Sequence, residues 1–163
     1  MVTILEGVNV RIDDQILVVK GPLGELHRTI PKIVQVKING NKLELSVNNP
    51  ALKGTLESVI NSMVIGVTTG YKRNLKLLHA HFPISIEVKG RDMFIKNFLG
   101  EKQPRKTIVV GTTKVDVKGQ SVTISGPDKE AVGQTIGNMK NAMKIKKKDA
   151  RTFQDGIYEL DKE

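Results

Sequence analysis

The chain has 163 residues, of which 39% are hydrophobic, and its 26 Lys and Arg outweigh its 17 Asp and Glu to give a net charge of +9. This composition favours a globular fold over a disordered one, and the charge predicts a polyanionic partner, nucleic acid before an anionic membrane surface. The absence of cysteine excludes disulfides, thiolate nucleophiles and Cys-ligated zinc. The first residues do not resemble a signal peptide, and no stretch approaches the roughly 18 apolar residues of a membrane span, so we expect a cytoplasmic protein without a membrane partner.

The first half of the chain predicts several strands followed by one helix. Short runs rich in Val, Ile and Leu alternate with turn residues at Val8–Ile12, Ile16–Lys20, Glu25–Ile30, Val34–Ile38 and Leu43–Val47. Asn49 followed by Pro50 is typical of a helix start, because the Asn side chain accepts from first-turn amides and proline fits the first helical position. From Leu52 to Val67 the apolar residues recur at spacings of three and four, which predicts a helix with one apolar face.

The second half repeats this order. Val115–Gln120 and Val122–Ser125 echo the hairpin of Val36–Asn41 and Leu43–Ser46, and Gly126-Pro127-Asp128 opens a second helix. The fold class we predict is α+β, with two similar domains that arose by duplication, each a mostly antiparallel sheet packed against one helix. We expect an N-terminal domain over 1–75, a C-terminal domain over 76–145 and a basic-to-acidic tail over 146–163. The strand-like stretch Tyr71–Phe82 joins the copies, and we expect Phe82–Glu163 to fold alone.

Positive charge peaks just behind the second helix. One short stretch holds a single acid, Asp149, and the cations Lys140, Lys144, Lys146, Lys147, Lys148 and Arg151. Such a run releases counterions from phosphates and so supplies sequence-independent affinity for RNA. A solvated helix end is the alternative, since lysine is also favourable beside the C-terminal helix dipole. We favour RNA, because three adjacent lysines repel one another unless an anion binds there.

The sequence offers no constellation for catalysis. Gly-x-Ser-x-Gly and His-Glu-x-x-His are absent, and Asp13-Asp14 reads as a turn. His79 and His81 would share one face of a strand, but only His27 could join them, so we predict no metal site and no cofactor. The chain is therefore not expected to be an enzyme. Gly133 and Gly137 in the second helix imply close approach by another group or, as we favour, tight packing on the domain's own sheet.

Taken together, the residues resemble the large-subunit ribosomal protein family numbered six in bacteria and nine in eukaryotes, over essentially the whole chain. The resemblance lies in Val19–Leu26 (VKGPLGEL), Ala80–Ile84 (AHFPI), Asn97–Lys102 (NFLGEK) and Lys148-x-x-Arg151-x-Phe153-x-Asp155-Gly156-Ile157-Tyr158. The last of these is the most specific, since it is similar to a signature of the archaeal and eukaryotic proteins.

The resemblance implies a structural constituent of the large ribosomal subunit that binds large-subunit rRNA near the sarcin–ricin region. Its partners would be that rRNA, neighbouring large-subunit proteins and, transiently, the translational GTPases that dock nearby; a eukaryotic source would add assembly in the nucleolus. Carried over residue by residue, the RNA-facing signature comprises Lys148, Arg151, Phe153, Asp155, Gly156 and Tyr158. From their charge we add Lys144, Lys146 and Lys147. A free regulatory RNA-binding protein is the alternative.

Two expectations concern the conformation of the tail. Phe153 and Tyr158 either pin the tail to the domain or stack on a base, and we favour pinning because they lie near Ile157 and Leu160. Asp155-Gly156 is a turn dipeptide, so Gly156 is expected outside either core with a positive φ.

Overall fold

The computed structural model describes residues 2–4, 7–39, 42–78, 82–146, 148–149 and 151–160. The chain divides into two compact units, the first formed by residues 1–71 with 127–129 and the second by residues 72–126 with 130–163. Within the described ranges no helix is long and apolar enough to cross a bilayer.

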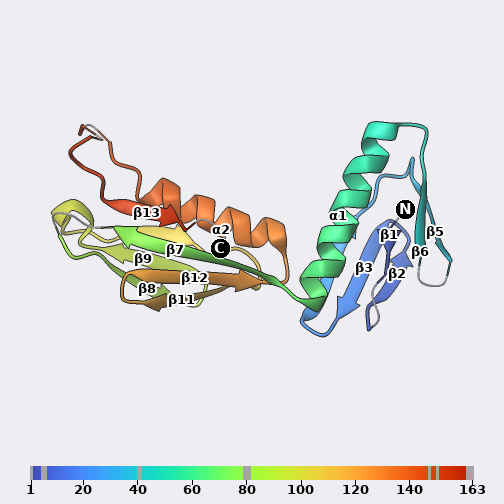
Figure 1. The fold of residues 1–163 in the computed structure, drawn as a ribbon, viewed down its shortest axis with the longest axis horizontal. Coiled ribbons are helices and arrows are strands. Elements are labelled where there is room, and N and C mark those ends of the chain that lie inside the picture. The colour runs from blue at the N-terminus through green and yellow to red at the C-terminus, as the bar shows by residue number, and fades with distance from the viewer. Residues whose placement is uncertain are drawn as a thin grey trace. The chain divides into compact units, whose positions relative to one another are not determined.

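The first unit combines short antiparallel strands with one long helix (Figure 1). Its elements are β1 (Val2–Thr3), β2 (Asn9–Asp13), β3 (Ile16–Gly21), β4 (Gly24–Thr29), β5 (Gln35–Asn39), β6 (Lys42–Ser46) and α1 (Pro50–Thr68). Over the described residues the strands form two sheets, with orders β2-β3-β4 and β1-β6-β5. Leu17, Leu43 and Ile60 meet in one buried core between the sheets and α1. The predicted helix start is confirmed, because Asn49 Oδ1 accepts from the amide of Ala51 at 3.0 Å.

The second unit also combines antiparallel strands with one helix, and one of its two sheets has four strands (Figure 1). Its elements are β7 (Tyr71–Leu78), β8 (Ser85–Lys89), β9 (Asp92–Lys96), the 3₁₀ turn η1 (Phe98–Gly100), β10 (Arg105–Ile108), β11 (Lys114–Lys118), β12 (Ser121–Gly126), α2 (Lys129–Ala142) and β13 (Gly156–Glu159). The described strands form one sheet of order β11-β12-β7-β13 and another of order β10-β9-β8. Leu75, Ile124 and Met139 are fully buried, as expected where sheet and helix faces pack together.

The predicted fold class is confirmed: two similar α+β units, each with antiparallel strands and one helix. The hairpins and both helices lie where the repeated sequence pattern predicts them. The division into 1–75, 76–145 and 146–163 stays a prediction, although β7 crosses its first boundary and β13 belongs to the same sheet as β7.

Candidate nucleic-acid interface

Among the described residues, β13 is the last strand and lies at the edge of a sheet of the second unit. β13 pairs antiparallel with β7, so that Gly156 stands opposite Leu78 and Glu159 opposite Leu75. Asp155, Gly156 and Ile157 are buried, and the amide of Leu160 continues the pairing by donating to the carbonyl of Asn74 at 3.1 Å. The expectation that Gly156 lies outside either core is therefore wrong, because the strand pairing draws these residues onto the sheet.

The expected positive φ at Gly156 is also wrong. The described glycines with a positive φ include Gly100 but not Gly156. A Cβ built on Gly156 would lie 3.6 Å from the Tyr158 ring, an ordinary van der Waals contact. Gly156 begins a strand rather than a turn, because its backbone can pair with β7.

Both signature aromatics contact residues of the tail itself. The Lys148 ammonium lies 4.5 Å from the centroid of the half-buried Phe153 ring, within cation–π range. The Tyr158 hydroxyl donates to the carbonyl of Gln154 at 3.0 Å, while 47% of Tyr158 stays exposed. The pinning of the rings stays a prediction; the contacts orient the rings and the Lys148 ammonium.

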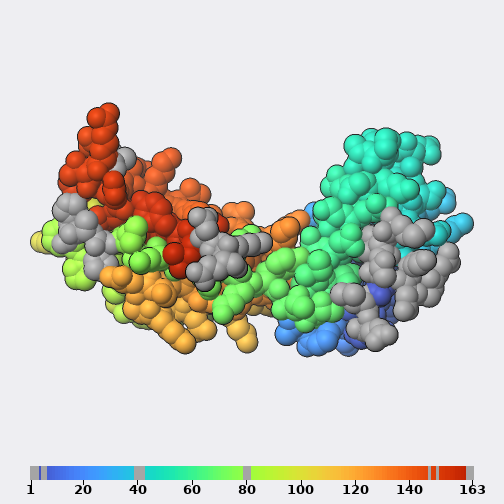
Figure 2. Space-filling model, viewed as in Figure 1, coloured from blue at the N-terminus to red at the C-terminus, as the bar shows by residue number. Residues whose placement is uncertain are grey.

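We call residues 144–151 the basic segment. It follows α2 directly: the buried Met143 donates its amide to the carbonyl of Met139 at 3.0 Å, and Lys144 donates its amide to Asn141 at 3.3 Å. The described cations of the segment, Lys144, Lys146, Lys148 and Arg151, are all exposed. Figure 2 shows the red C-terminal part of the chain projecting from the surface of the second unit at the upper left. Lys147 lies outside the described residues.

Asp149 shapes the turn at the end of the basic segment, ahead of β13. Its side chain accepts from the amide of Arg151 at 3.0 Å, and its carbonyl accepts from the amide of Phe153 at 2.9 Å. An Asp that binds its own following backbone in this way is typical of turns. The one acid of the cationic run therefore organises the local backbone.

Lys140 serves a different purpose from the other cations of the run. Its ammonium lies 2.6 Å from Glu159 Oε1 and so joins α2 to β13. The hydrogen bond from Lys140 holds the pKa of Glu159 below its ordinary value, and the charges of Lys140 and Arg73 act in the same direction. Lys140 thus fixes β13 to α2.

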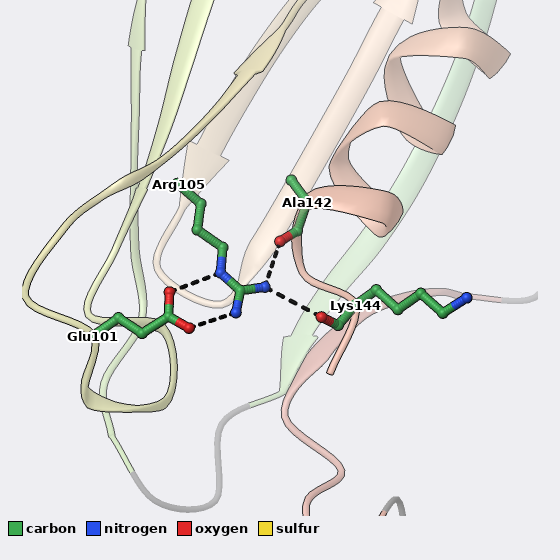
Figure 3. Close-up of polar contacts among 4 residues, drawn as sticks. All are labelled: Glu101, Arg105, Ala142 and Lys144. Carbon is green, nitrogen blue, oxygen red and sulfur yellow. Dashed lines mark hydrogen bonds and ion pairs between the residues drawn. The ribbon is translucent and has the colours of Figure 1, made fainter. Parts of the chain in front are cut away.

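Arg105 of β10 anchors the start of the basic segment (Figure 3). Its Nε and Nη2 donate to the two carboxylate oxygens of Glu101, the former at 2.7 Å. Its Nη1 donates to the carbonyls of Ala142 at 2.7 Å and Lys144 at 3.2 Å. Sequence reasoning missed Arg105, because these carbonyls lie 37 and 39 residues further along the chain and no local pattern marks such a contact.

The two glycines of α2 do not pack on the sheet. A Cβ built on Gly133 or Gly137 would meet nothing within 4 Å, so the tight packing we favoured there is wrong. The buried face of the helix comprises Val132, Ile136 and Met139, and the glycines lie to one side of it. Within the described ranges no group of three or more His, Cys, Asp or Glu could hold a metal ion, and His79 and His81 lie outside them.

Comparison with known proteins decides the family. The model of a family described as ribosomal protein L6 matches residues 4–70 and 82–156. The chain belongs to the ribosomal protein L6 family. The two matched stretches cover the first unit and most of the second, including the basic segment, and membership confirms both the resemblance and the prediction that the chain is not an enzyme.

Individual members of the L6 family are similar to this chain over most or nearly all of its length. The large ribosomal subunit protein uL6 of Methanobrevibacter smithii is 45% identical over 99% of this chain and 94% of its own length. The protein of the same name from Methanosarcina mazei is 39% identical over 99% of this chain and 95% of its own length. That of Archaeoglobus fulgidus is 40% identical over 85% of this chain and 74% of its own length.

Proposed function

We propose that the protein is a structural constituent of the large ribosomal subunit and binds large-subunit rRNA through the basic segment and the tail of its second unit. The observation that carries this proposal is the group of exposed cations Lys144, Lys146, Lys148 and Arg151, held between α2 and β13. The relatives, which are named as large-subunit proteins, support the same assignment.

The binding mechanism is electrostatic and follows from how the cations are held. Exposed ammonium and guanidinium groups contact phosphate oxygens and release condensed counterions, which supplies affinity without reading the base sequence. The contacts of Arg105 and Asp149 restrain the backbone on both sides of Lys146. The free protein is therefore already partly ordered there, which reduces the conformational entropy that binding costs.

The place on the subunit follows from the resemblance of the signature residues. We propose that the second unit docks beside the sarcin–ricin region of the large rRNA, in the cytoplasm, where translational GTPases come near. Phe153, Asp155, Gly156 and Tyr158 would then shape the surface at β13 and just before it, and Tyr158 would present its exposed part to the partner.

The salt dependence of rRNA binding tests the proposal. Replacing Lys144, Lys146 and Lys148 by Gln should weaken binding of the full chain to large-subunit rRNA. It should also lower the log–log slope against salt by roughly 0.7 to 0.9 for each phosphate that the variant no longer neutralises. The control is the triple replacement of exposed first-unit lysines Lys32, Lys37 and Lys53 by Gln, which changes the net charge equally.

An equal fall in affinity and slope in both triple variants would leave only a general charge effect and contradict the assigned interface. Co-sedimentation with large subunits in high salt addresses the alternative. A ribosomal constituent stays with the subunit, whereas a free regulatory RNA-binding protein is recovered apart from it and binds an isolated target.

A further inference from the structure

Glu101 and Arg105 form a bidentate ion pair at the point where α2 ends and the basic segment begins (Figure 3). We propose that this pair is a positioning device for RNA binding, in which Glu101 orients Arg105 and Arg105 holds the backbone from Ala142 to Lys144. The inference rests on the proposed function, because it concerns how the same cations are presented to rRNA.

The last carbonyls of an α-helix have no partner within the helix. Here the Arg105 guanidinium donates to the carbonyl of Ala142, the last residue of α2, and to that of Lys144, two residues beyond the helix. The planar guanidinium presents several donors in a fixed geometry, so one side chain binds the carboxylate and both carbonyls at once. A lysine ammonium at this position could not reproduce that arrangement.

Glu101 and Arg105 are each fixed by further contacts. The guanidinium carbon lies 4.5 Å from the centroid of the Phe98 ring, and Phe98 is only 1% exposed. The turn that carries Glu101 is fastened by its own contacts: Asn97 Nδ2 donates to the carbonyl of Pro83 at 3.0 Å, and the amide of Glu101 donates to Phe98 at 3.0 Å. The turn that carries Glu101 and the guanidinium of Arg105 are therefore each held by further contacts.

Glu101 can affect RNA binding in two opposite ways, through its charge and through the geometry that it imposes on Arg105. Arg105 lowers the pKa of Glu101 mainly through their hydrogen bond, and Lys148 adds a Coulombic contribution. Glu101 is thus an anion close enough to interact with Lys148, one of the cations proposed to bind phosphate. By charge alone, such a carboxylate opposes RNA binding and its removal should help. By geometry, its removal should loosen the basic segment and weaken RNA binding. The two accounts therefore predict opposite changes in RNA affinity.

The test compares two carboxylates of the second unit. Glu101→Gln removes one negative charge and the bidentate acceptor, whereas Glu87→Gln removes one negative charge from a pair with Lys96 whose N–O distance is 2.6 Å. The two carboxylate side chains are similarly exposed, at 40% and 43%. We expect Glu101→Gln to bind large-subunit rRNA about three- to tenfold more weakly than wild type, and Glu87→Gln to bind at least as tightly as wild type. Equal or tighter binding by Glu101→Gln would overturn the inference.

A local readout distinguishes positioning from general destabilisation. In Glu101→Gln, hydrogen exchange at the amides of Met143 and Lys144 should accelerate, while the amides of β12 keep their protection. Arg105→Lys, which keeps the charge, should weaken binding in the same way and decides the matter if Glu101→Gln fails to fold; unchanged affinity in Arg105→Lys would then overturn the inference. If the lysine triple variant loses affinity but the Glu101 and Arg105 variants do not, the positioning fails and the proposed function stands. If the lysine triple variant also binds rRNA with the affinity of wild type, the proposed function itself is contradicted.

Discussion

Gly100 and Gly156 belong to the same unit but differ in backbone conformation. Gly100 has a φ of +77°, and a Cβ there would lie 3.2 Å from the Phe82 ring, whereas Gly156 is in strand β13 with room for a methyl group. Gly100→Ala should destabilise the second unit by about 1–2 kcal/mol, because L-residues disfavour positive φ. Gly156→Ala should change its stability by less than about 0.5 kcal/mol.

Urea unfolding followed by amide signals of α2 measures both substitutions in one transition. A destabilisation by Gly156→Ala as large as that by Gly100→Ala would show that Gly156 is constrained in a way its extended backbone does not explain. The exposure of Lys144 and Lys146 was predictable from their charge, whereas the contacts of Arg105 depend on residues distant in sequence.

Elements with strong periodicity were predictable, including the short strands of the hairpin β11–β12, whereas β13 was not. The apolar spacing of α1 and the hairpin β11–β12 reflect burial of one face, which local sequence records directly. β13 has only four residues, of which only Gly156 and Ile157 are buried, so it lacks the alternating apolar pattern of a half-buried strand. Its strand conformation depends on pairing with β7, a contact between segments far apart in the chain, so the pattern by itself indicated only a tail.

Acid should weaken the contacts that fix the tail and the end of α2. The pKa values of Glu101 and Glu159 are lowered in the folded protein, by hydrogen bonds from Arg105 and Lys140 respectively. Each carboxylate therefore stabilises the fold above its ordinary pKa of 4.5, and the stabilisation is lost as the pH falls through the lower folded value. Because both side chains are partly exposed, we expect less than about 1 kcal/mol from each.

The measurement for this prediction is the melting temperature of the second unit between pH 7 and pH 3. The double variant Glu101→Gln with Glu159→Gln should be less stable than wild type at pH 7 and should lose less stability towards pH 3. Parallel curves for the two proteins would mean that neither pair contributes to the pH dependence.

For the molecule as a whole, the two units predict two cores that fold separately. The second unit begins at residue 72, earlier than the start at residue 76 that we predicted for the C-terminal domain. β7 lies between β12 and β13, and its Leu75 and Leu77 are at most 1% exposed. A fragment that begins at Phe82 lacks this strand and should not fold stably, contrary to our expectation from the sequence. A fragment over 72–163 should fold with a cooperative melt, although so small a unit is marginally stable.

Circular dichroism and thermal melts of the two fragments check this prediction. The longer fragment should also keep most of the rRNA affinity of the full chain, since it contains the whole basic segment and β13. A folded 72–163 fragment that binds rRNA no better than residues 1–71 would contradict the assignment of the interface to the second unit.

The central claim is that the second unit meets large-subunit rRNA through residues 144–158. Cross-linking of the full chain to rRNA within assembled large subunits, followed by identification of the attached peptides, tests it most directly. The account predicts that the cross-linked peptides come mainly from the basic segment and β13. Cross-links confined to the first unit, with the peptides of residues 144–158 recovered unmodified, would contradict it.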